Sequence, residues 1–179
     1  MFIYDKKLQY PVKIARPNPR LASIIISQYG GPDGELGASL RYLSQRYSMP
    51  FDELKGLLTD IGTEELGHLE MIGAIVHQLT RNMKDEQYRD PAFAPYFVDH
   101  TAGVYPTAAS GFPWSAASMQ VKGDPIADLA EDLGADATRM NSQQIKRPRC
   151  LTHRGVTWKI ISGFCRSRRR RPAFLPQQQ

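Results

Sequence analysis

The sequence predicts an all-α protein built as a helical bundle, and three observations support that class. Long segments carry apolar residues at alternating spacings of three and four, which is the period of an amphipathic helix. Proline and glycine stand between these segments, where they end one helix and precede the next. Acidic side chains recur inside the apolar stripes. Burying such groups is costly unless they are paired, so their recurrence indicates a site within the bundle.

The first helical segment is predicted over residues 20–47. The insert "GGPDGE" is expected to kink this helix or to split it in two, because Pro32 removes a backbone donor and the glycines loosen the chain. One member of its stripe is acidic. The stripe consists of Leu21, Ile24, Gln28, Gly31, Glu35, Ala38 and Tyr42.

The second helical segment begins near Pro50 and has the clearest periodicity in the chain. Two polar residues, Glu65 and His68, stand in the middle of a stripe that is otherwise aliphatic. Because they are three residues apart, both project from the same side of the helix. The stripe consists of Leu54, Leu58, Ile61, Glu65, His68, Ile72, Ile75 and Leu79.

The third helical segment begins at "GDPIADLAEDLGAD", with Asp124 as the N-cap and Pro125 at the first helical position. The preceding residues 82–124 are rich in proline, glycine and aromatic residues and show no helical period. A connection of this length is expected to be a crossover or a subunit contact. The stripe of the third helix consists of Ile126, Leu129, Leu133, Asp136 and Met140.

Charge divides the chain sharply. All eighteen acidic residues lie at or before Asp136, and the sequence ends in the basic run "RSRRRRPAFLPQQQ". We therefore expect a domain over residues 1–140 and a basic, disordered tail over residues 141–179. This tail is a solvated extension, a patch for nucleic acid or an acidic partner, or an out-of-frame or chimeric gene end. We favour the last as its origin. No aromatic ladder accompanies the arginines, so no specific nucleic-acid partner is expected.

Other features narrow the functional classes. No run of about 18 apolar residues occurs, so no membrane partner is expected. The two cysteines lie far apart and form no ligand pattern, which favours a reducing, cytoplasmic compartment. The histidines His77, His100 and His153 have no partner at metal-ligand spacing.

The pair Glu65 and His68 permits a metal site, although a lone ExxH is more often a half-buried histidine beside an acid. Glu35 and Asp136 occupy the stripes of the other two helices. Three buried acids would repel one another unless a cation lay between them. Carboxylates from two helices with ExxH from two others form the dimetal site of ferritin-like four-helix bundles. Here only one ExxH occurs, and the fourth helix is missing or replaced by the basic tail.

The stretches "GGPDGELGASLRYLSQRY", "TDIGTEELGHLEMI" and "GDPIADLAEDL" resemble the manganese catalase family, in particular its spore-coat branch. The resemblance covers roughly residues 1–133. It implies a ferritin-like bundle with a dimanganese centre that dismutates hydrogen peroxide to water and oxygen. It also implies catalytic and metal-binding roles for Glu35 as a terminal carboxylate, Glu65 as the bridging carboxylate and His68 as the imidazole ligand. Asp136 falls at the position of the family's third glutamate and is one methylene shorter. The family's second histidine and the glutamate before it have no counterpart.

Two functions follow from the resemblance and stay open. The first is an enzyme whose small-molecule partner is hydrogen peroxide and whose cofactor is manganese, although ligand type alone does not separate manganese from iron. The second is a structural component of the spore coat without catalytic activity. The resemblance further implies other spore-coat proteins and further copies of the chain as partners, with the spore coat as an alternative location to the cytoplasm.

Overall fold

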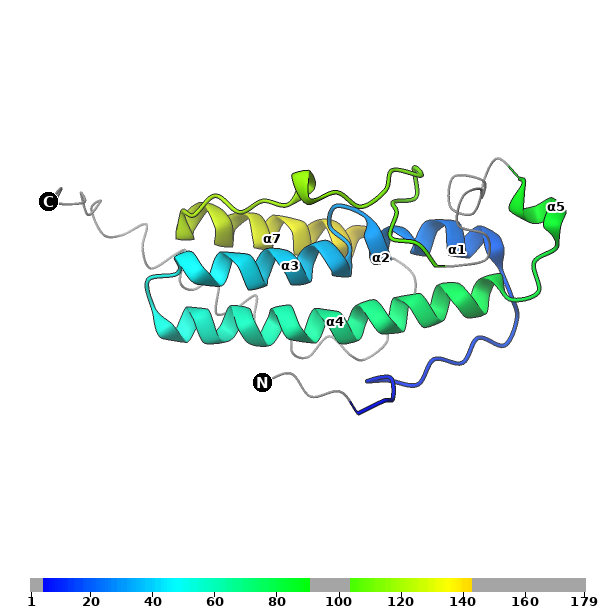
Figure 1. The fold of residues 1–179 in the computed structure, drawn as a ribbon, viewed down its shortest axis with the longest axis horizontal. Helices are drawn as coiled ribbons and strands as arrows, with labels where there is room; N and C mark the ends of the chain where they lie inside the picture. Colours follow the sequence, from blue (N-terminus) through cyan, green and yellow to red (C-terminus); the bar gives the residue numbers. More distant parts are fainter. Residues whose placement is uncertain (1–4, 91–103, 143–179) are drawn as a thin grey trace, which may run out of the picture. The chain divides into compact units, whose positions relative to one another are not determined.

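The computed structural model describes residues 5–90 and 104–142, except for the side chains of residues 88 and 136–142. Within these residues the regular structure is helical, apart from an isolated bridge between Thr107 and Pro113, so the all-α prediction is confirmed (Figure 1). The predicted disorder of the basic tail lies outside the described residues. The helices are α1 (Pro19–Ile25), α2 (Ser27–Gly30), α3 (Glu35–Gln45), α4 (Asp52–Thr80), α5 (Asp85–Tyr88) and α7 (Pro125–Ser142), with 3-10 turns η1 (Arg46–Ser48) and η2 (Ala116–Ser118).

The chain divides into two compact units, residues 1–123 and residues 124–179. In the first unit, the "GGPDGE" segment separates α2 from α3, which confirms the predicted split. Gly34 adopts an extended conformation and caps α3, so that Glu35 becomes the first residue of that helix. A Cβ atom at Gly30 would collide with the backbone of Pro106 and Thr107, so the close approach of this later segment requires a glycine.

In α1 the predicted stripe is wrong at Ile24, whereas Leu21 packs against the core as predicted. Ile24 is 55% exposed, whereas Ala22 and Ile26 are buried. These two residues form a core cluster with Val76 and Leu79 of α4. Ile24 is exposed because α1 ends at Ile25. The face that α1 buries therefore does not have to line up with the buried face of α3.

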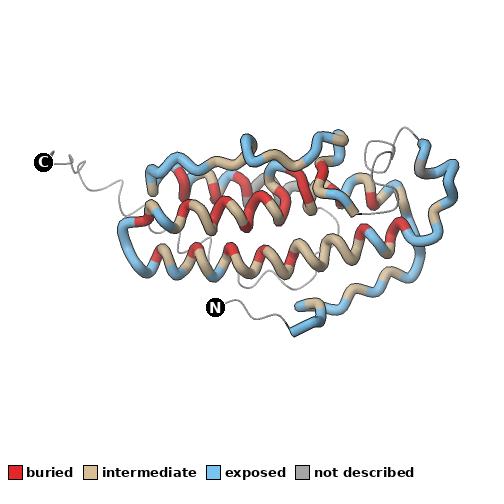
Figure 2. Tube along the Cα trace, viewed as in Figure 1, coloured by how far each residue is buried: buried red, intermediate tan, exposed pale blue. Residues whose placement is uncertain are grey.

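Helices α3 and α4 are joined by η1 and lie side by side as an antiparallel pair (Figure 1). Both helices carry many buried residues (Figure 2). The Ser39 hydroxyl donates a 2.6 Å hydrogen bond to the Gly62 carbonyl, which indicates close contact between the two backbones. No described helix has both the length and the apolar character that a membrane span requires.

The N-terminal arm, residues 5–18, follows the second half of α4 (Figure 1). Gln78 fixes the arm with both ends of its amide: Oε1 accepts from the backbone N–H of Ile14 at 2.8 Å, and Nε2 donates to the carbonyl of Val12 at 2.9 Å. The backbone N–H of Asn18 donates to the carbonyl of Leu79 at 2.9 Å. Several separate hydrogen bonds therefore hold the arm on the helix.

The end of the long connection, residues 104–123, belongs to the first unit. Its own turn is closed by a 2.8 Å bond from the backbone N–H of Trp114 to the carbonyl of Pro106. The side chain of Gln45, in the last turn of α3, donates to the carbonyl of Gln120 at 2.9 Å. This part of the predicted crossover is therefore attached to α3, whereas residues 91–103 lie outside the described residues.

The second unit contains α7. The carboxylate of Asp124 accepts from the backbone N–H groups of Ile126 and Ala127, both at 2.9 Å, so the predicted N-cap is confirmed. The predicted stripe is wrong at Ile126, which is 50% exposed. The buried face begins at Asp128, which lies two residues later and therefore on the opposite side of the helix. That face consists of Asp128, Leu129, Asp132 and Ala135.

Candidate metal centre

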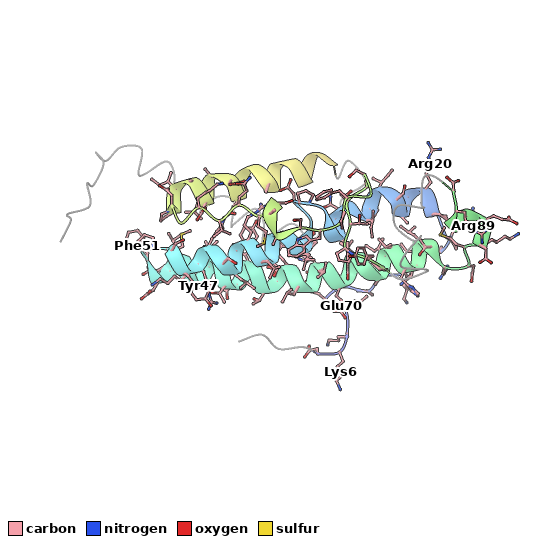
Figure 3. The ribbon with its side chains drawn as sticks, turned by 45° about the horizontal axis from the view of Figure 1, so that its top comes forward. Lys6, Arg20, Tyr47, Phe51, Glu70 and Arg89 are labelled. Carbon is pink, nitrogen blue, oxygen red and sulfur yellow. The ribbon has the colours of Figure 1, made fainter. Side chains whose placement is uncertain are left out.

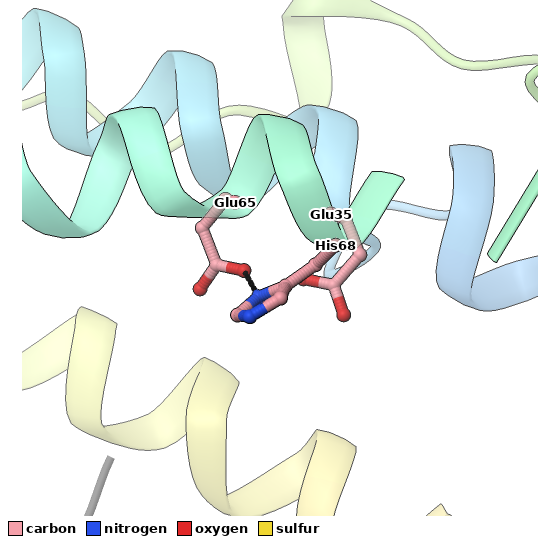
Figure 4. A group of neighbouring side chains, drawn as sticks. All are labelled: Glu35, Glu65 and His68. Atoms are coloured by element: carbon pink, nitrogen blue, oxygen red, sulfur yellow. Dashed lines mark hydrogen bonds and ion pairs between the residues drawn. The ribbon is translucent and has the colours of Figure 1, made fainter. Parts of the chain in front are cut away.

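Three ligand-type side chains from two helices converge inside the first unit (Figure 4). Glu35 comes from the first turn of α3, and Glu65 and His68 come from the middle of α4. One ligand atom from each lies within 4.8 Å of the others. All three are buried, with exposed fractions of 2%, 3% and 8%. The predicted convergence is confirmed, and the described residues contain no second group of this kind.

Local structure explains the placement of each side chain. The uninterrupted helix α4 puts Glu65 and His68 on one face, since residues three apart are neighbours on a helix. The turn that ends at Gly34 starts α3 at Glu35, so this carboxylate lies at the positive end of the helix dipole. The helix end therefore offsets part of the cost of burying the charge of Glu35.

The distances show how crowded the group is. The Nδ1 atom of His68 lies 2.6 Å from Oε2 of Glu65, which is a short hydrogen bond, and 4.0 Å from Oε2 of Glu35. An oxygen atom of Glu35 and one of Glu65 lie within 4.8 Å of each other. Two buried, charged carboxylates this close repel each other, and a proton or a cation between them removes that repulsion. The group offers two hard oxygen donors and one imidazole, a donor set that suits manganese or iron. The residues therefore fit a manganese ion.

The other predicted site residue, Asp136, is placed only by its backbone, which belongs to α7. Its side chain lies outside the described residues, so its metal-binding role stays a prediction. His77 is exposed on the last turn of α4. His100 and His153 lie outside the described residues.

The structure adds polar residues that the stripes left out. Glu64 brings Oε1 to 3.8 Å from Nε2 of His68, whereas Glu65 contacts Nδ1. The signal was present in "EELGH", because Glu64 and His68 are four residues apart. Arg41 is only 1% exposed and donates to Asp33 at 3.2 Å. A stripe built on apolar residues could not identify a buried arginine.

A buried Glu–Glu–His group inside a helical unit is typical of metalloproteins that bind their metal ions with carboxylate and imidazole side chains in the core of a helical bundle. The family model described as manganese containing catalase matches residues 1–147. The chain therefore belongs to the manganese catalase family, and the predicted resemblance is confirmed.

Individual relatives agree with this assignment. Protein CotJC of Bacillus subtilis is 53% identical over 136 residues, which cover 76% of this chain and 71% of that protein. A manganese catalase of Bacillus subtilis is 31% identical over 150 residues, which cover 76% of this chain and 55% of that enzyme. The crystal structure of KatB, a manganese catalase from Anabaena, matches with a TM-score of 0.79 at 27% identity, and covers 100% of this chain and 87% of that one. The ferritin-like bundle is therefore the fold. The chain spans only about half the length of the manganese catalase from Bacillus subtilis.

Proposed function

We propose that Glu35, Glu65 and His68 bind manganese and that the protein dismutates hydrogen peroxide, converting two molecules into two of water and one of oxygen. The observation that carries this proposal is the convergence of the three buried side chains within 4.8 Å. The family assignment supports manganese as the ion and peroxide as the substrate.

Each residue has a defined part in this proposal. The carboxylates of Glu35 and Glu65 neutralise the charge of the ion, and Glu65 also contacts the imidazole directly. His68 supplies a nitrogen donor through Nδ1, the ring atom that faces both carboxylates. Burial keeps bulk water away from the group, which strengthens its electrostatic interactions. When bound, manganese supplies one-electron changes of oxidation state, which the dismutation requires.

A second ion would need further ligands. The described residues provide one complete set, and Asp136 is the remaining acid that the resemblance assigns to the site. We infer that the chain binds about one ion or fewer and turns over peroxide more slowly than a family member that has both histidine ligands.

The second candidate function is a structural component of the spore coat that keeps the metal-binding scaffold. The 53% identity with protein CotJC favours it. It differs from the first candidate in one measurable respect, because it requires the fold and the assembly but no turnover of peroxide.

Metal analysis and oxygen evolution on the purified full chain test both candidates. His68→Gln removes the imidazole donor, and His77→Gln is the matched control because His77 is exposed on the same helix. We expect the original chain and His77→Gln to bind manganese and to release oxygen from peroxide, and His68→Gln to lose both. Bound manganese without oxygen release would favour the structural candidate. Equal manganese content in all three proteins would refute the site.

A further inference from the structure

A tight turn, residues 31–34, precedes α3 and fixes where that helix begins. The backbone N–H of Gly34 donates to the carbonyl of Gly31 at 2.9 Å and closes the turn. A Cβ atom at Gly34 would lie 2.8 Å from the carbonyl oxygen of Ser27, so the turn packs directly against α2. Glu35 follows the turn and is the first residue of α3. The position of its backbone therefore depends on the turn.

Arg41 reaches back from the middle of α3 to this turn. Its Nη2 donates to the carbonyl of Pro32 at 3.3 Å and to Oδ1 of Asp33 at 3.2 Å. One nitrogen thus bonds the backbone of one central turn residue and the side chain of the other. A Cβ atom at Gly37 would lie 2.7 Å from the same Pro32 oxygen, so this carbonyl lies against the first turns of α3. The guanidinium therefore ties the turn to the helix that follows it.

The charge of Arg41 is poorly compensated for a buried group. Arg41 is 1% exposed, and its Nε and Nη1 have no hydrogen-bond partner among the described residues. The side chain of Asp33 is 41% exposed, so water screens this ion pair. A buried charge with such a partner contributes little net stability, because its loss of hydration offsets the attraction. Its contacts can still select one conformation of the chain, which here is that of the turn.

The start of α3 matters because it carries Glu35. Helix ends fray, and a first residue that leaves the helical conformation no longer projects in the direction that the helix sets. Oε2 of Glu35 lies 4.0 Å from Nδ1 of His68 (Figure 4). Glu65 and His68 come from the middle of a long helix, whereas Glu35 comes from a helix end. Of the three candidate ligands, Glu35 therefore depends most on the turn.

We propose that Arg41 is a positioning residue for Glu35: it holds the turn that starts α3 and so keeps this carboxylate beside the other two candidate ligands. The proposal rests on the metal site proposed above. It goes beyond that site, because Arg41 is not a ligand and acts only through the turn.

Hydrogen exchange of the metal-free full chain tests the hold on the turn without any metal. The reporters are the amides of Gly34, which closes the turn, and Ala38, which bonds in the first turn of α3. The amide of Lys55 reports on the first turn of α4 instead. We expect Arg41→Met to speed exchange about tenfold at Gly34 and Ala38, because the turn opens more often, and to leave Lys55 unchanged.

Manganese titration tests the effect on the site. Removal of a positive charge would by itself strengthen the binding of a cation, whereas loss of position weakens it, so the two effects have opposite signs. We expect Arg41→Met to weaken binding about tenfold. Arg20→Met is the matched control, because Arg20 is exposed on α1 and carries the same charge (Figure 3). It should leave both the affinity and the exchange rates unchanged.

Two further variants separate position from general stability. Arg41→Ala should be less stable than Arg41→Met, yet both should bind manganese equally weakly, since both release the turn. Arg41→Lys keeps the charge and a donor, so it should restore part of the affinity. Manganese affinities that follow the free energies of unfolding instead would show that Arg41 acts on general stability and would overturn the proposal.

The two proposals can fail separately. Unchanged exchange at Gly34 and Ala38 in Arg41→Met, or manganese binding as tight as in the original chain, would overturn the role of Arg41. Faster exchange there in a chain that binds no manganese would support the hold on the turn and would refute the metal site. If Arg41→Met failed to fold, as judged by circular dichroism, Arg41→Lys and Asp33→Ala would decide the question by the same two measurements.

Discussion

The hydroxyl of Ser39 donates a 2.6 Å hydrogen bond to the carbonyl of Gly62, and this bond joins α3 to α4 one helical turn from the candidate metal centre. Ser39 is four residues after Glu35, and Gly62 is three residues before Glu65. The bond therefore fixes the register that brings the two carboxylates together.

Ser39→Ala tests this relationship. The variant removes a buried donor, so we expect it to lower the free energy of unfolding by about 1 kcal/mol. The resulting freedom between α3 and α4 should also weaken manganese binding. Urea unfolding and manganese titration measure the two effects. Ser44→Ala, in the same helix, is the control and should change neither by a comparable amount.

Glycines in α4 should respond to alanine in opposite directions. A Cβ atom at Gly62 would lie 2.7 Å from Cγ of Leu43 and 3.3 Å from its backbone nitrogen, so Gly62→Ala should push α3 away and destabilise the protein. At Gly56 no atom lies within 4 Å of the added Cβ, and Gly56→Ala should stabilise the helix by up to about 1 kcal/mol. Thermal unfolding of the two variants measures the difference. Similar shifts in both would show that α3 and α4 tolerate a wider spacing.

The buried guanidinium of Arg41 should be replaced more easily by methionine than by alanine. Among the described residues its Nη2 donates to Pro32 and Asp33, whereas Nε and Nη1 have no hydrogen-bond partner. Methionine fills much of the volume and avoids the cost of a buried charge. Arg41→Ala leaves a cavity and should lower the free energy of unfolding by about 2–4 kcal/mol, and Arg41→Met by clearly less. A loss as large for methionine would mean that the contacts to Pro32 and Asp33 dominate.

The start of α4 should show a small stability effect at acidic pH. A hydrogen bond from Lys55, and then its positive charge, lower the pKa of Asp52 below the ordinary aspartate value. A carboxylate with a lowered pKa in the folded state contributes stability that is present above the unfolded pKa. This stability is lost as the pH falls through the folded pKa. Carboxyl NMR titration should show a higher Asp52 pKa in Lys55→Gln, whereas an unchanged pKa would mean that the pair has no effect in solution.

Asp136→Glu tests the remaining ligand that the resemblance implies. Glutamate adds the methylene that the family's third carboxylate has, so the variant should raise the manganese content per chain. Asp136→Asn should lower it, and Glu131→Gln, half-buried on the same helix, should leave it unchanged. Metal analysis of the three variants is the measurement. Equal manganese content in all three variants would show that Asp136 is not a ligand.

The exposed aromatic residues Tyr47 and Phe51 mark the turn between α3 and α4 (Figure 3). The break between these helices was readable from "SMPFDEL", and the separation of α2 from α3 from "GGPDGE". The N-cap at Asp124 followed from residue type alone. Local signals of this kind depend on neighbours in the chain, so the order of the helices and most of their ends could be predicted from the sequence.

The pairing of Glu65 with His68 was also determined locally, because a continuous helix puts residues three apart on one face. The position of Glu35 beside them depends on helix packing, since the register between α3 and α4 is set by contacts such as Ser39 with Gly62. The exposure of Ile24, and the contact of Glu64 with the second ring nitrogen of His68, were decided in the same way. Helical periodicity fixes the angles between side chains on one helix, whereas packing decides which of those side chains point toward a neighbouring element.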